Sequence, residues 1–83
     1  MKDSLAEINE DMVLADGFDD ALVGYVERIP LPTVACYDKK KCIEILMKDM
    51  TSEEAEEYFD YNVAGSYVGE NTPCFLTIIN EKR

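Results

Sequence analysis

The stretch DKKKCIEILMKDMTSEEAEEYF, residues 38–59, predicts two consecutive helices and decides the helical half of the fold. Asp38 is a suitable N-cap for a first helix that runs to about Asp49. Thr51 and Glu54 have the spacing of a capping box, which starts a second helix with acids in its first turn. Residues at helical spacing predict the inner face of this pair, and they are Cys42, Ile45, Leu46, Ala55, Tyr58, Phe59 and Asn62.

Three other stretches have the residue types of strands, and they span residues 21–29, 33–37 and 74–79. A segment with two prolines separates the first two, and we expect these strands to pair antiparallel across it, because proline cannot donate to a strand ladder. Apolar residues on both sides of 21–29 predict that both of its faces are buried. Gly24 within this strand predicts either a bulge or the close approach of another backbone.

The first residues predict a short N-terminal helix from about Leu5, since Ser4 and Glu7 fit a capping box. The predicted fold class is α+β: a small two-layer domain of about three antiparallel strands packed by a helical hairpin, with this additional helix. A chain of 83 residues is long enough for one domain and not for two. We expect residues 1–83 to form that single domain, with its core in residues 15–79.

Net charge is the strongest chemical feature of the sequence. Eighteen acidic residues face eight basic ones, which gives a charge of −10. Such a charge repels nucleic acid and anionic membranes and favours basic protein partners, although it is also a simple source of solubility. No apolar run approaches the roughly 20 residues that span a bilayer. Residues 1–4 lack the apolar segment of a signal peptide, so we expect a cytoplasmic protein.

The sequence lacks the residues on which most enzyme sites depend. It has no histidine, no evident nucleophile–base pair and no glycine-rich phosphate loop. We therefore predict that the protein is not an enzyme and needs no cofactor. Its cysteines, Cys36, Cys42 and Cys74, lie in apolar stretches, and we expect reduced, partly buried thiols with a structural role.

The sharpest candidate for a chemical site is a cluster of three carboxylates, Asp16, Asp19 and Asp20. With a glycine to bend the chain, this cluster could hold a hard cation and support a small metal-dependent hydrolase. The segment lacks the twelve-residue pattern of a calcium loop. The interpretation that we favour is an acidic turn whose carboxylates cap nearby amides before the first strand.

The second predicted helix carries the densest run of negative charge. Along it, Glu53, Glu57 and Asp60 fall on one outer edge, which spans about 10 Å at 1.5 Å per residue. Their separation of about 5 Å resembles the coarse spacing of charges along a nucleic-acid backbone. The competing interpretation is a solvated helix face. The predicted partner-binding residues are Glu53, Glu54, Glu56, Glu57, Asp60 and Tyr61.

Several segments resemble a family of short uncharacterised proteins encoded by bacteriophages and prophages. They are ADGFDDALVG from Ala15, KCIEILM from Lys41, EEAEEYF from Glu53 and NVAGSYVGENTP from Asn62. The resemblance covers residues 15–76 and leaves the first 14 residues outside. It implies a phage context and the cytoplasm of a bacterial host, and it implies no activity and no catalytic residues.

Small acidic phage proteins are often inhibitors of host defence, including mimics of nucleic acid. The resemblance therefore implies an acidic binding protein that inhibits a defence protein or another nucleic-acid-handling protein of the host. Its partner would be a basic host protein, without direct contact to nucleic acid or to a membrane. Two alternatives remain: the metal-dependent hydrolase built on the aspartate cluster, and a self-associating structural protein that forms a homodimer through an exposed strand edge.

Overall fold

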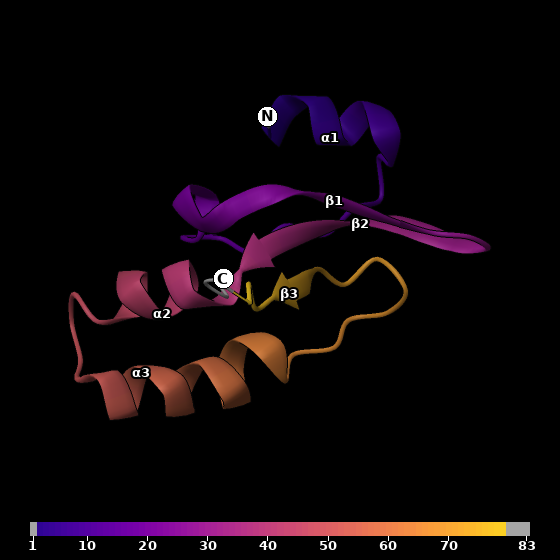
Figure 1. Cartoon of the computed structure of the whole chain (residues 1–83). Helices are drawn as coiled ribbons and strands as arrows, with labels where there is room; N and C mark the ends of the chain where they lie inside the picture. The colour runs from indigo at the N-terminus through magenta and orange to yellow at the C-terminus, as the bar shows by residue number, and fades with distance from the viewer. Residues whose placement is uncertain (1, 80–83) are drawn as a thin grey trace.

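The computed structural model describes residues 2–79, with side chains from Ser4 onward, and shows a small α+β domain (Figure 1). The predicted fold class is confirmed. Figure 1 places α1 at one end of the molecule and α3 at the other, with the strands between them. The elements are α1 (Lys2–Ile8), the 3-10 turn η1 (Asp19–Ala21), β1 (Leu22–Arg28), β2 (Leu31–Asp38), α2 (Lys39–Leu46), α3 (Ser52–Tyr58), the π-helical η2 (Phe59–Ala64) and β3 (Cys74–Leu76).

Within residues 2–79 the sheet has the strand order β1-β2-β3. β1 pairs antiparallel with β2, as the sequence predicts. The predicted direction of the third strand is wrong, because β3 runs parallel to β2, with Cys36 opposite Cys74. Parallel neighbours require a long crossover connection. Here α2, α3, η2 and the loop after them supply that connection and bring the chain back beside Cys36, from which β3 runs along the end of β2.

Asp38 is the residue at which β2 ends and α2 begins. Its side chain accepts hydrogen bonds from two backbone N–H groups in the first turn of α2, at 2.9 and 3.4 Å, which confirms the predicted N-cap. α2 ends at Leu46 and is shorter than predicted. β3 is also shorter than predicted, because its pairing partner β2 ends at Asp38. The last pair joins Leu76 to Asp38, and residues 77–79 are exposed and lie outside the strand.

β1 exposes one of its faces, which corrects the prediction that both are buried. Leu22 and Val26 are half-buried, whereas Val23 and Tyr25 are 39% and 47% exposed. The reason is that the hydrophobic core packs against one side of this edge strand only. Gly24 forms the predicted bulge with a φ of 156°, and nothing in the described chain lies within 4 Å of the place that a Cβ would take.

α1 is joined to the fold by Leu5, which is buried, and by the residue that follows the helix. The helix begins before Ser4, so this serine lies inside it and is not the predicted N-cap. Asn9 donates through Nδ2 to the carbonyl oxygen of Thr33 and to Oδ1 of Asn71, at 2.9 Å each. These hydrogen bonds connect three segments that are distant in sequence.

α3 and η2 bury a narrower face than predicted. Ala55 and Phe59 are buried, whereas Tyr58 is 44% exposed and Asn62 is also exposed, so the prediction that the latter two face inward is wrong. The inner residues recur every four positions, at Ala55, Phe59 and the half-buried Val63. A residue one position before each of them falls on the flank of the helix, where solvent reaches it.

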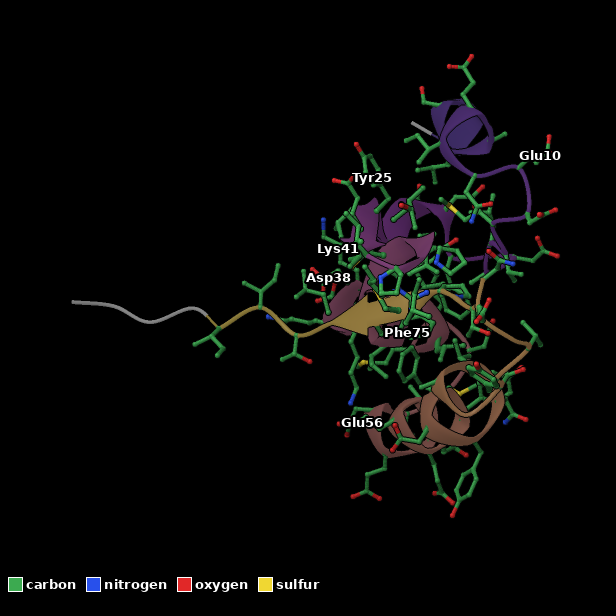
Figure 2. All side chains as sticks on the ribbon, turned by 90° about the vertical axis from the view of Figure 1, so that its right-hand side faces the viewer. Glu10, Tyr25, Asp38, Lys41, Glu56 and Phe75 are labelled. Carbon is green, nitrogen blue, oxygen red and sulfur yellow. The ribbon has the colours of Figure 1, made fainter. Side chains whose placement is uncertain are left out.

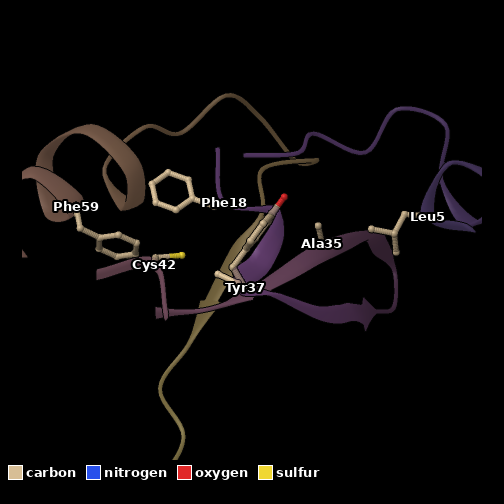
Figure 3. Close-up of a cluster of buried hydrophobic side chains, with 7 residues drawn as sticks. Leu5, Phe18, Ala35, Tyr37, Cys42 and Phe59 are labelled. Atoms are coloured by element: carbon tan, nitrogen blue, oxygen red, sulfur yellow. The ribbon is translucent and has the colours of Figure 1, made fainter. Parts of the chain in front are cut away.

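The core gathers aromatic side chains from the turn, the sheet and η2 (Figure 3). Phe59 meets Phe75 edge-on with ring centroids 5.0 Å apart, and the Phe75 ring lies 5.8 Å from that of Tyr37. The Tyr37 hydroxyl accepts a hydrogen bond from the backbone N–H of Ala15 at 2.8 Å. Buried Phe18 follows shortly after in the chain, so the acidic turn is attached to the core from within.

The three cysteines are free, and two of them are buried. Burial raises the pKa of Cys42 to about 11. Burial, together with a hydrogen bond between the thiols of Cys36 and Cys74, raises the pKa of Cys36 to about 11. The buried thiols are therefore protonated at neutral pH, which suits the structural role that the sequence predicts for them.

Candidate functional site

The outer side of α3 and η2 presents carboxylates together with a tyrosine. Figure 2 shows Glu56 on α3, at the end of the molecule opposite to α1 and Glu10. Tyr61 is 78% exposed. The sequence contains no basic residue between Lys48 and Lys82, so the charges along this helix are all negative. All six predicted partner-binding residues are exposed, and we call them the acidic face: Glu53, Glu54, Glu56, Glu57, Asp60 and Tyr61.

The predicted capping box is present at the start of α3. The backbone N–H of Thr51 donates to Oε1 of Glu54 at 2.9 Å, and the backbone N–H of Glu54 donates to Oγ1 of Thr51 at 3.2 Å. The backbone hydrogen bond from Thr51, and secondly its side chain, lower the pKa of the Glu54 carboxyl group. Glu54 therefore stabilises the start of the helix that presents the other carboxylates.

A shallow depression of about 290 Å³ lies on the acidic face. Tyr58 and Tyr61 line it together with Glu54, Glu57 and Asn62. Aromatic rings beside carboxylates can contact both the aliphatic stem and the charged end of a basic side chain. Tyr58 was not predicted to lie at the surface, although its position directly before the buried Phe59 places it off the inner face.

A larger hollow of about 480 Å³ opens beside the acidic face. It is bounded by residues 13–18, the end of α2 with the segment after it, the α3–η2 helix with its following loop, and Phe75 of β3. Tyr58 and Asn62 line both the hollow and the depression, so the two adjoin at these side chains. The hollow was not predictable from the sequence, because its wall comes from segments that are separated along the chain.

The three aspartates of the predicted metal cluster are exposed but point to different surroundings. Phe18 is buried between them, Asp16 lines the hollow, and Asp20 lines a separate depression that includes Lys41. Asp19 begins η1 with Asp20. In the part of the chain that the structure describes, no group of three potential ligands is placed to hold a metal ion.

Comparisons with known protein families, with curated proteins and with solved structures find no match for this chain. Among residues 2–79, no helix has the length and apolar character needed to cross a membrane.

Proposed function

We propose that the protein is a small acidic binding protein of phage type that inhibits a defence protein or another nucleic-acid-handling protein of a bacterial host, without catalysis of its own. The observation that carries this proposal is the acidic face, an exposed side of α3 and η2 on which carboxylates lie together with Tyr61 and to which these helices contribute no basic residue. The phage-like sequence segments support the bacterial context, and the host cytoplasm is where we expect the protein to act.

The proposed mechanism is occupation of a positively charged groove of the partner. Carboxylates that follow one helix at intervals of about 5 Å can meet the basic side chains that otherwise contact phosphates. Complementary charge accelerates the encounter and favours basic partners over others. Tyr58 and Tyr61 add aromatic contact area, the kind of contact that usually supplies much of the affinity at a protein interface.

A pull-down from host lysate at low and high salt tests the proposal with two matched variants. The test variant reverses three charges of the acidic face, Glu53→Lys, Glu57→Lys and Asp60→Lys. The control variant reverses three exposed carboxylates in α1 and directly after it, Glu7→Lys, Glu10→Lys and Asp11→Lys, of which Figure 2 labels Glu10. Both variants change the net charge by the same amount, and they reverse it at opposite ends of the molecule.

We expect the wild type and the control variant to retain the same partner at low salt. The test variant should retain at most about one tenth as much of this partner, because several charge pairs are lost together. High salt should also release the partner, since exposed charges are screened beyond roughly 8 Å at physiological ionic strength. Recovery of the partner by both variants alike, at both salt concentrations, would show that the acidic face is only a solvated helix side.

A second candidate function is self-association through the β1–β2 hairpin. One observation favours it: β1 is an edge of the sheet, and apolar side chains on and near it are exposed, namely Val23, Tyr25, Ile29 and Leu31. Sedimentation of the purified chain decides the point, because a stable dimer at micromolar concentration supports self-association and a monomer rejects it. A homodimer of this kind would leave the acidic face open to a host partner.

A further inference from the structure

The hollow beside α3 combines two properties that together indicate one kind of ligand. Most of its lining residues are apolar, and they include Phe18, Leu46 and Val63. Two exposed carboxylates, Asp16 and Asp49, also line it, and no basic residue does so in the described part of the chain. Its volume of about 480 Å³ lies within the range of about 300–1,000 Å³ that is usual for ligand pockets.

We propose that this hollow receives an arginine or lysine side chain of the basic protein partner, an inference that rests on the proposed function and gives it an anchor point. Both side chains have an aliphatic stem and a cationic end. The stem matches the apolar lining of the hollow, and the cation matches Asp16 and Asp49. An aliphatic ligand without charge would leave these carboxylates unused, and an anionic ligand would be repelled by them.

The hollow adjoins the depression on the acidic face, so this anchor would belong to the same interface. Tyr58 and Asn62 line both the hollow and the depression on α3. A partner segment that lies along α3 can therefore place basic side chains over the acidic face and insert another around the flank of the helix. There the Tyr58 ring, which is 44% exposed, is available to contact a guanidinium or ammonium group.

The test is an NMR titration of the full chain with the peptide acetyl-Gly-Gly-Arg-Gly-Gly-amide. A matched peptide carries norleucine in place of arginine and so keeps the aliphatic stem without the charge. Asp16→Asn with Asp49→Asn removes the two carboxylates of the hollow. Asp20→Asn with Glu44→Gln is the matched control, because these two exposed acids line the separate depression. Spectra of the free variants verify that each keeps the fold.

We expect the arginine peptide to shift the amide signals of residues 13–18, 49 and 66 in a saturable way, and more strongly than the norleucine peptide. The double variant of the hollow should weaken this binding about tenfold, whereas the control double variant should weaken it less than about twofold. Equal affinity of the two double variants, or no saturable shift at these residues, would overturn the inference.

This test and the pull-down fail independently. The pull-down variants change Glu53, Glu57 and Asp60, none of which lines the hollow. If the acidic-face variant loses the partner and the hollow does not bind the arginine peptide, only the anchor is wrong. If the hollow binds the peptide and the acidic-face variant keeps the partner, the hollow is a cation site and the proposed function is wrong.

Discussion

Two acidic stretches of this chain, residues 16–20 and the acidic face on α3, have similar composition and different structural outcomes. In the turn, Phe18 enters the core, and Asp16 and Asp20 line separate depressions on either side of it. On α3 and η2, Ala55 and Phe59 enter the core, while the acids around them remain together on the exposed side. The difference shows what turns an acidic sequence into an acidic surface. A regular helix returns side chains to one side every three or four residues, whereas a short turn disperses them.

Two substitutions in the turn separate its structural role from its charge. Phe18→Ala should destabilise the protein by about 3–5 kcal/mol, because it removes a buried aromatic ring and leaves a cavity in the core. Asp20→Asn, an exposed substitution in the same turn, should change the free energy of unfolding by less than about 0.5 kcal/mol. Urea unfolding measures both variants. Equal stabilities would mean that Phe18 does not hold the turn to the core.

The same comparison explains which parts of the fold were predictable from the sequence. The N-cap at Asp38 and the capping box of Thr51 and Glu54 depend on residues within a single helical turn, and both predictions are confirmed. The antiparallel pairing of β1 with β2 follows from a short connection and is also confirmed. The exposure of the acidic residues on α3 follows from the helical period together with their charge.

Features that depend on distant segments were not predictable. The direction of β3 is set by the place to which the chain returns after a long crossover, and no local signal near Cys74 specifies it. The hollow requires four segments to meet, so the roles of Asp16 and Asp49 in its lining are visible only in the folded structure. The inward position predicted for Tyr58 was wrong. Only Ala55 and Phe59 are buried along this stretch, and Tyr58 lies beside them on the flank of the helix.

The capping box at the start of α3 should make the stability of the protein depend on pH. Hydrogen bonds from Thr51 lower the pKa of Glu54 in the folded protein. The charged form therefore contributes stability that is complete above the ordinary pKa of glutamate and is lost as the pH falls through the lowered pKa. Glu54→Gln keeps a side-chain oxygen that can accept the hydrogen bond from the Thr51 N–H, and it removes the carboxyl group that titrates. Acidification from about pH 7 to about pH 3 should destabilise this variant less than the wild type.

Glu56→Gln is the matched control for that measurement, because Glu56 is exposed on the same helix and lies outside the capping box. It should keep more of the acid sensitivity of the wild type than Glu54→Gln does. Urea unfolding at the two pH values gives the comparison. The same acid sensitivity in both variants would show that the capping box does not respond to protonation of Glu54.

Hydrogen–deuterium exchange of the chain, alone and bound to the partner captured in the pull-down, tests the central claim most directly. The claim is that the acidic face is a binding surface and that the aspartates of η1 are not. We therefore expect backbone amides of residues 52–62 to exchange more slowly in the complex, with no change in η1 and β1. Slower exchange in η1 and β1, with residues 52–62 unchanged, would contradict the claim and place the partner on the hairpin side of the molecule.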